Sequence, residues 1–192
     1  MVNQFGNYLL FVGLITSILV IFFSFRSIKT NEKNISLNIF SLISLQFLFV
    51  IISFLSLIYL FIVSDFSNEI VYKNSHTTKP LFYKISGTWG NHEGSLLLWL
   101  IVLTLFLFIF AITSKKLPII YRLLTISFQQ IIITGFFLFI IFTSNPFNYL
   151  YPSPSEGLGL NPILQDPALA IHPPILYVGY VGTSIIFSAS IS

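Results

Sequence analysis

Five uncharged apolar runs alternate with segments that hold all of the charged residues. The five apolar runs are Tyr8–Phe25, Ile39–Ser64, Ser95–Thr113, Leu123–Thr143 and Pro173–Ser192. A transmembrane helix needs about 20 mostly apolar residues to cross the hydrocarbon, and each run approaches or exceeds that length. Because the backbone polar groups of a span in lipid must be satisfied internally, spans of this kind are helical. The pattern predicts an all-α, polytopic membrane protein with about five transmembrane helices.

The composition excludes several classes of protein. Hydrophobic residues make up 55% of the 192 residues and charged residues 8%, against roughly 25% charged in an average soluble domain. A soluble enzyme, a soluble nucleic-acid binder and a disordered protein all need more polar surface than this. We therefore expect contact with membrane lipid and no nucleic-acid partner. There is no cysteine, which excludes disulfides, thiolate nucleophiles and cysteine metal sites in this chain.

The basic residues orient the predicted bundle. Short loops rich in Lys and Arg stay on the inner side of the membrane. The first and third loops carry Arg26, Lys29, Lys33, Lys115, Lys116 and Arg122. The N-terminus and two long loops, residues 65–94 and 144–172, are therefore predicted on the outer face. These two outer-face loops hold every histidine and every acid except Glu32. Long loops are commonly functional, so we expect the function at the outer face.

The first outer loop ends in the motif Trp89-Gly90-Asn91-His92-Glu93-Gly94-Ser95. Ser95 is a plausible N-cap for the third span, and Glu93 would lie near the positive end of that helix dipole. Trp89 suits the membrane interface. This interpretation makes the motif a tight helix start. The alternative is that His92 and Glu93 line a ligand surface, although one His beside one Glu is not the spacing of a metal site.

The second outer loop contains two Asx-Pro pairs, each with the form of an N-cap followed by proline at the first helical position. The pairs Asn161-Pro162 and Asp166-Pro167 predict two short helical turns along the membrane surface. His172-Pro173-Pro174 follows and is predicted to open the fifth span, because prolines are tolerated in a first helical turn.

His172 would then lie at the N-terminus of a helix with an extended backbone, since it precedes a proline. The positive end of the helix dipole disfavours a protonated imidazole, and the neutral form is the one that binds iron. The alternative is a histidine that hydrogen-bonds at the interface, because a single histidine specifies no metal.

Glutamines occur inside two predicted spans, at Gln46, Gln129 and Gln130. We expect them to hydrogen-bond between helices or to partner chains. A transport pathway is the alternative, but no charged residue lies in the middle of a span to support it.

The two outer motifs together resemble the N-terminal part of the CcmF family, the membrane haem lyase subunits of cytochrome c maturation. The resemblance rests on Trp89 to Trp99 and on Leu160 to Gly182, which includes His172-Pro173-Pro174 and Tyr177-Val178-Gly179-Tyr180. It implies that His172 is an outer-face axial ligand to haem. The family's tryptophan-rich WWD segment, second outer haem histidine and transmembrane haem histidines have no counterpart here. We therefore expect residues 1–192 to be a single membrane domain, the N-terminal fragment of a larger split haem lyase.

The resemblance also implies partners and a cofactor. The cofactor is haem, and the partners are other CcmF fragments carrying the WWD segment, a CcmH-type thiol partner, the haem chaperone CcmE and apocytochrome c. We do not expect the chain to be active alone. The residues implied in cofactor binding are His172 as metal ligand, with Pro173, Pro174, Tyr177, Asn161, Gln165, Asp166, Trp89, His92 and Glu93. Lys73, Lys79, Lys84 or the start of the fifth span would contact the propionates.

The composition and the resemblance together predict the cellular membrane in which the protein lies. The abundance of Phe and Ile suits an AT-rich organelle genome. We expect a multi-pass protein of the mitochondrial inner membrane with its N-terminus toward the intermembrane space, or alternatively a bacterial inner-membrane protein. Two other functions remain open: a subunit of a haem or small-solute transporter, and a structural subunit of a respiratory complex.

Overall fold

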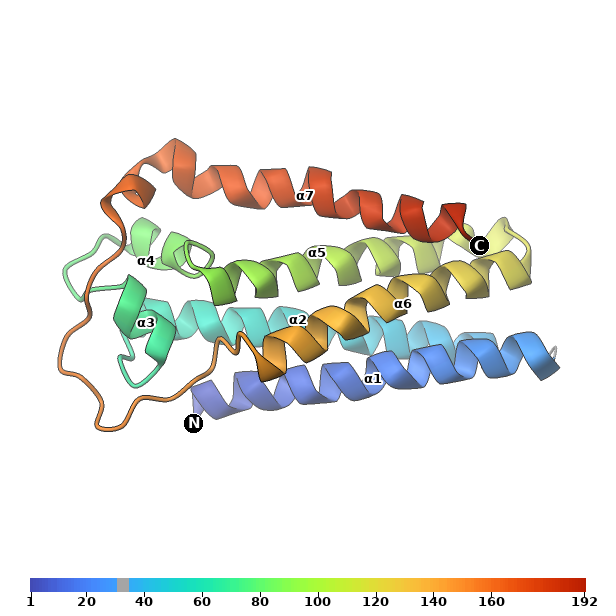
Figure 1. The fold of residues 1–192 in the computed structure, drawn as a ribbon, viewed down its shortest axis with the longest axis horizontal. Helices are drawn as coiled ribbons and strands as arrows, with labels where there is room; N and C mark the ends of the chain where they lie inside the picture. The colour runs from blue at the N-terminus through green and yellow to red at the C-terminus, as the bar shows by residue number, and fades with distance from the viewer. Residues whose placement is uncertain (31–34) are drawn as a thin grey trace.

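Five long helices lie side by side in the computed structural model, which describes residues 1–30 and 35–192 (Figure 1). They are α1 (Val2–Thr30), α2 (Ile35–Val63), α5 (His92–Thr113), α6 (Ile119–Phe142) and α7 (Pro167–Ser190). All five are long and apolar enough to cross a membrane. The predicted fold class and the predicted number of spans are confirmed, and the chain is a multi-pass membrane protein.

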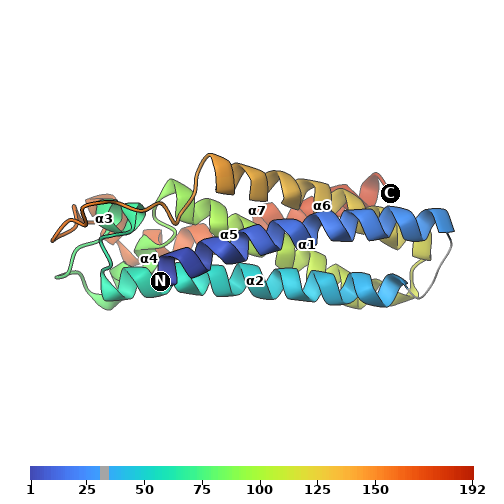
Figure 2. The same ribbon diagram turned by 90° about the horizontal axis from the view of Figure 1, so that it is seen from below.

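The connecting segments contain shorter helical elements, of which only the turn that begins at the Asn161-Pro162 pair was predicted. They are α3 (Glu69–Asn74), α4 (Leu81–Gly87) and two 3-10 turns, η1 (Ser114–Lys116) and η2 (Pro162–Gln165). Figures 1 and 2 show α3, α4 and the start of α7 at the end of the bundle where α1 begins. Both long loops therefore share one end with the N-terminus, as predicted. Lys33, which contributed to the predicted orientation, lies outside the described residues.

The helices α1, α2, α5 and α6 form the packed part of the bundle, and α7 lies at its edge. Helix α1 packs against α2 and α6, while α7 packs against α5 and α6. In the most apolar stretch of α7 only 17% of the residues are buried, against 39% to 50% in the other four. Most of the surface of α7 is thus open to lipid or to another polypeptide.

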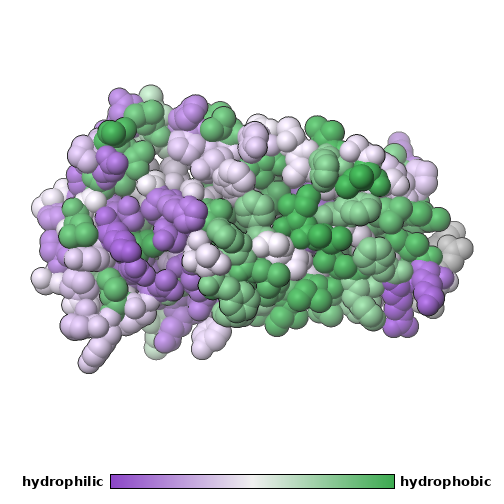
Figure 3. All heavy atoms as spheres, in the orientation of Figure 1, coloured by the Kyte–Doolittle hydropathy of each residue, from purple (hydrophilic) through white to green (hydrophobic). Residues whose placement is uncertain are grey.

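The surface has the distribution expected of a membrane protein. Figure 3 shows hydrophobic side chains over the middle of the bundle and hydrophilic ones gathered mainly at the end that holds α3 and α4. Large apolar side chains such as Phe22, Leu55 and Phe142 are more than half exposed on the long helices. In water this exposure would be costly, whereas in lipid it needs no compensation.

The glutamines inside the spans join the helices to one another. Gln46 of α2 and Gln130 of α6 exchange hydrogen bonds through their side-chain amides, at 3.2 Å and 2.7 Å. The hydroxyl of Ser17 in α1 donates to Oε1 of Gln130 at 2.7 Å. Gln129 similarly contacts Ser184 and Ser188 of α7. The predicted role in hydrogen bonding between helices is confirmed, and these contacts hold each polar group away from lipid.

Candidate functional site

The first outer motif forms the start of α5, but the capping residue is not the predicted one. Asn91 is the N-cap, and its side-chain oxygen accepts a hydrogen bond from the backbone N–H of Gly94 at 2.8 Å. The prediction that Ser95 caps the helix is wrong, because the chain already becomes helical at His92. The Ser95 hydroxyl instead donates to the carbonyl of His92 at 2.8 Å. Glu93 lies in the first turn, as predicted.

The second outer motif forms two caps, of which only the first begins a short turn. Asn161 caps η2 and accepts from the N–H of Ile163 at 3.1 Å. Asp166 caps α7 and accepts from the N–H groups of Ala168 and Leu169 at 2.8 Å and 3.1 Å. The predicted second short turn is therefore wrong, since Asp166-Pro167 starts the long fifth helix itself.

The two prolines after His172 lie inside α7 rather than at its start. Proline has no N–H, so Pro173 and Pro174 leave the carbonyls four residues earlier, those of Leu169 and Ala170, without their usual helical donors. The indole Nε1–H of Trp89 donates to the carbonyl of Ala170 at 2.8 Å. A tryptophan of the first motif thus replaces the hydrogen bond that a proline of the second motif removes.

His172 is the sixth residue of α7, in its second turn. The predicted position at the helix N-terminus is wrong, and so is the predicted extended backbone, because the Asp166 cap starts the helix before the prolines. The field of a helix dipole is confined to its first turn, so the dipole argument for a neutral imidazole does not apply here. The His172 side chain is exposed. It has no hydrogen-bond or ion-pair partner among residues 1–30 and 35–192.

Tyr177 lies on a different side of α7 from His172, because five residues correspond to about 140° of helical rotation. Its ring packs edge-on against Trp99 of α5, with ring centroids 5.4 Å apart. Tyr180 also contacts Trp99, at 6.0 Å. The structure therefore places Tyr177 in the packing of α7 against α5 and does not bring it together with His172.

His92 and Gln165 are placed by other contacts. The Nε2 atom of His92 lies 3.2 Å from the hydroxyl of Ser144, and its ring meets Phe139 of α6 edge-on. Gln165 donates from Nε2 to the carbonyl of Leu160 at 2.9 Å, which folds the chain around η2. Of the predicted site residues, the structure brings Trp89 to the end of the first turn of α7. The backbone that leads to His172 is shaped by Asn161, Gln165 and Asp166.

The two outer loops are joined by contacts that the sequence did not indicate. The carboxylate of Glu156 accepts hydrogen bonds from the backbone N–H and the hydroxyl of Thr77, at 3.0 Å and 2.6 Å. It also lies 3.8 Å from Nδ1 of His76. The bonds from Thr77, with one from the N–H of Gly157 and the charge of His76, lower the pKa of Glu156 from 4.5 to about 2. No pattern marks this contact in the sequence, since the partners are 79 residues apart.

The Glu156 contact predicts a pH-dependent loosening of the two loops. A carboxylate whose pKa is depressed on folding stabilises the folded form above its unfolded pKa of 4.5, and this contribution is lost as the pH falls toward about 2. We expect amide protection around Thr77 and Gly157, corrected for intrinsic exchange, to fall across that window in hydrogen-exchange mass spectrometry. In Glu156→Gln the protection of the same amides should not change with pH. An equal fall in that variant would assign the transition to another group.

The outer lysines differ in their partners. Lys73 pairs with Glu69, and the hydrogen bond from Lys73 lowers the pKa of the Glu69 carboxyl. Lys84 donates to the hydroxyl of Ser64 at 2.8 Å. Lys79 is partly buried, and within the described parts of the chain its ammonium has no acidic partner. Lys79 is therefore the lysine of this loop most available to an external anion.

The arrangement defines a class of protein: a helical membrane protein whose two outer motifs are hydrogen-bonded to each other beside an exposed imidazole. Residues 89–192 match the family described as "Cytochrome C assembly protein". The chain is 42% identical over its full length to the cytochrome c-type biogenesis protein CycK of Rhizobium meliloti and 38% identical to CcmF of Escherichia coli. It covers 28% and 30% of those two proteins.

A solved structure titled "Cytochrome c Heme Lyase CcmF" has the same fold. The match has a TM-score of 0.83 at 25% identity and covers 98% of this chain and 29% of the other. The chain belongs to the cytochrome c assembly protein family, and the resemblance to CcmF inferred from its motifs is confirmed. It spans less than a third of the length of these relatives.

Proposed function

We propose that this chain is a haem-binding part of a haem lyase that attaches haem to apocytochrome c, with His172 as an outer-face axial ligand. One observation carries the proposal: the ring of His172 is exposed on α7 and has no partner in the described chain, while the residues around it are held in place. The Asp166 cap and the bond from Trp89 to Ala170 fix the helix turns that carry it. A metal ligand requires an accessible imidazole on a backbone that its neighbours hold in place.

The residues present fit one side of a haem. Haem is flat and apolar, and its iron accepts an imidazole at an axial position. Exposed apolar side chains flank His172 on α7, at Ile171, Ile175 and Leu176. Among the described residues no three His, Asp or Glu side chains gather into a metal site of their own. This suits a chain that offers a single axial ligand while the porphyrin supplies the other bonds to iron.

The other predicted site residues support this surface in different ways. The backbone on either side of His172 is shaped by Pro173, Pro174, Asn161, Gln165 and Asp166. Trp89 connects that backbone to the α5 start, which carries His92 and Glu93. Lys79 is the candidate for a propionate contact. When bound, haem would supply the vinyl groups to which the cysteine thiols of apocytochrome c add. This chain has no cysteine of its own.

The proposed partners come from the family resemblance, and the large exposed surface of α7 supports contact with one of them. We infer that residues 1–192 act as one membrane domain whose α7 face meets further haem lyase sequence carrying the WWD segment. CcmE would deliver haem, and a CcmH-type partner would handle thiols. The relatives named above are bacterial, which supports a bacterial inner membrane with the N-terminus outside. The composition supports a mitochondrial inner membrane with the N-terminus toward the intermembrane space.

The transporter alternative loses its main support in this structure. It requires polar groups that line a path through the bilayer. The side chains of Gln46 and Gln130 bond to each other, and Gln129 bonds to the serines of α7. These amides therefore satisfy one another and hold helices together.

The ligand role is tested by His172→Ala in the assembled haem lyase, with bound haem measured by its absorption spectrum and mature cytochrome c by haem staining. Loss of supporting contacts at metal sites typically costs tenfold to a hundredfold, so removal of the ligand itself should cost at least about tenfold in retained haem. Because the ring is exposed, added imidazole should restore part of the haem spectrum.

The matched control is His76→Ala, which removes another outer-face imidazole that contacts Thr78 and Glu156. Haem retention in this variant should stay within about twofold of the unmodified protein. Normal haem content and normal maturation in His172→Ala would exclude the ligand role. Equal losses in both variants would indicate damage to the outer loops rather than to a ligand.

A further inference from the structure

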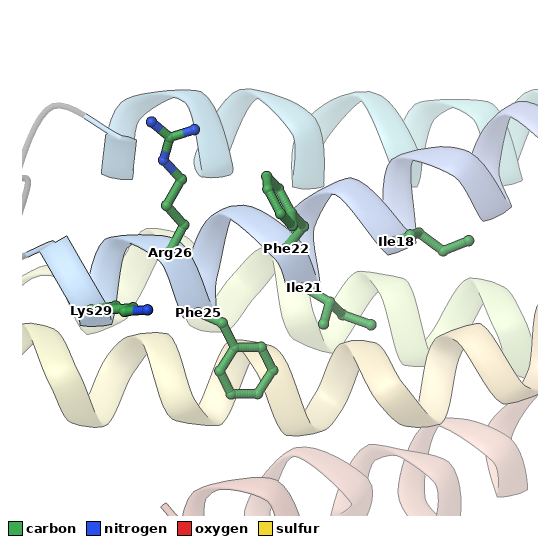
Figure 4. A pocket seen from close by; sticks show the side chains of 6 residues that line it. All are labelled: Ile18, Ile21, Phe22, Phe25, Arg26 and Lys29. Carbon is green, nitrogen blue, oxygen red and sulfur yellow. The ribbon is translucent and has the colours of Figure 1, made fainter.

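An open apolar groove runs along the C-terminal half of α1. It has a volume of about 540 Å³ and is lined by Ile18, Ile21, Phe22, Phe25, Arg26 and Lys29 (Figure 4). All six belong to one side of α1, because residues three and four apart lie on the same face of a helix. In the sequence, the residues that line the groove lie far from both outer motifs. Binding of a ligand here would not depend on the proposed haem function.

The walls of the groove are apolar and exposed. Ile18, Phe22 and Phe25 are 51%, 56% and 48% exposed, although each is a large hydrophobic side chain. They belong to a helix long and apolar enough to cross a membrane, where the acyl chains of the bilayer are chemically matched to them. The groove therefore offers an acyl chain a surface that runs along the direction of the span.

Two positively charged side chains lie at one end of the groove. Arg26 and Lys29 are one helical turn apart and both are exposed. Neither side chain has an ion-pair partner within residues 1–30 and 35–192. They lie at the end of α1 that the positive-inside rule assigns to the inner leaflet. The polar headgroups of that leaflet, and not its acyl chains, are at this depth.

We propose that this groove binds one anionic phospholipid of the inner leaflet, with its phosphate between Arg26 and Lys29 and an acyl chain along Phe25, Phe22 and Ile18. An arginine fork and an ammonium together match the oxygens of a phosphate diester. Basic pockets on the inner side of membrane helices are suited to such headgroups. A zwitterionic lipid fits the apolar walls equally well but gains less from the two cations.

The test uses the full chain in phosphatidylcholine vesicles that contain a trace of spin-labelled lipid. The fraction of label immobilised by the protein is compared for phosphatidylglycerol and for phosphatidylcholine. We expect the unmodified protein to prefer phosphatidylglycerol. Each cation near the surface is worth about fivefold in binding, so Arg26→Gln with Lys29→Gln should remove most of that preference.

The matched control is Lys115→Gln with Lys116→Gln, which removes the same charge from the other inner loop. Lys115 and Lys116 are exposed and belong to η1, outside the groove. This control should keep the preference for phosphatidylglycerol. An equal loss in both double variants would overturn the proposal in favour of general surface charge, and an unchanged preference in Arg26→Gln with Lys29→Gln would overturn it outright.

A second arm separates the lipid from a free anion. Excess inorganic phosphate should leave the immobilised fraction unchanged, because the acyl chain contributes to lipid binding and a free phosphate lacks it. Displacement of the labelled lipid by millimolar phosphate at constant ionic strength would mean that the cations form a phosphate site, and the lipid assignment would fail.

Discussion

Gly94→Ala is expected to destabilise the protein by about 3 kcal/mol or more, a large effect for the addition of one methyl group. A Cβ at position 94 would overlap the backbone carbonyl of Thr88. The obstructing atoms are backbone atoms of Thr88, whose carbonyl also accepts a hydrogen bond from the Asn91 side chain, so the chain cannot move them cheaply. The turn would open, the Asn91 cap would be lost, and Trp89 would shift away from Ala170.

The measurement is unfolding of the chain in mixed micelles, followed by tryptophan fluorescence. Gly179→Ala is the control, because a Cβ on this glycine of α7 meets no described atom within 4 Å outside the adjacent backbone of its own helix. Within a helix this change should stabilise by roughly 0.5–1 kcal/mol, since alanine loses less backbone freedom on folding. Similar stabilities for the two variants would refute the steric argument.

Trp89→Phe is expected to cost about 1–3 kcal/mol, because it removes the donor while keeping an aromatic ring. Ala170 is 4% exposed, and its carbonyl has no helical donor because residue 174 is proline. The same unfolding measurement applies, with hydrogen exchange in the first two turns of α7 as a local readout. We expect exchange to rise there before the rest of the bundle is affected.

Two further variants isolate this hydrogen bond. Trp99→Phe changes the other tryptophan, whose ring stacks on Phe136 and meets Tyr177 edge-on. This change should lower the free energy of unfolding by less than Trp89→Phe does. Pro174→Ala restores a backbone N–H to the helix and supplies a new donor for Ala170. In a Trp89→Phe background this second change should recover most of the lost stability. Additive losses in the double variant would show that Trp89 acts through packing alone.

The hydrogen bond from Trp89 to the Ala170 carbonyl, which Pro174 leaves without a helical donor, also bears on why the start of α7 was predicted incorrectly from the sequence. Two consecutive prolines normally mark a helix start, and the residue before proline disfavours the helical backbone. Both rules are local. They do not include a donor from a residue 81 positions away in sequence. The Asp166 cap was visible in the sequence, but the donor that Trp89 supplies to the proline-containing turn was not.

The misplaced cap of α5 has a similar cause. Ser95 precedes the apolar run and is a good capping residue, so the hydrophobic pattern favoured it. Asn91 is an equally good cap, and the close packing of Gly94 against Thr88 allows the helix to begin there. The hydrophobic pattern gives the part of a helix that lies in lipid, whereas the cap depends on how the loop before it folds.

The five spans and the two outer motifs were predictable from the amino-acid sequence, because bilayer thickness constrains each span separately and each motif is continuous in the chain. The glutamine contacts were also foreseeable as a class, since polar groups in lipid must find partners. Only the folded molecule shows the identity of those partners and the first residues of α5 and α7. It also shows that His172 is exposed while Tyr177, on another side of α7, is packed against α5. These features depend on contacts between residues far apart in the chain, such as Trp89 with Ala170 and Thr77 with Glu156, which no local pattern encodes.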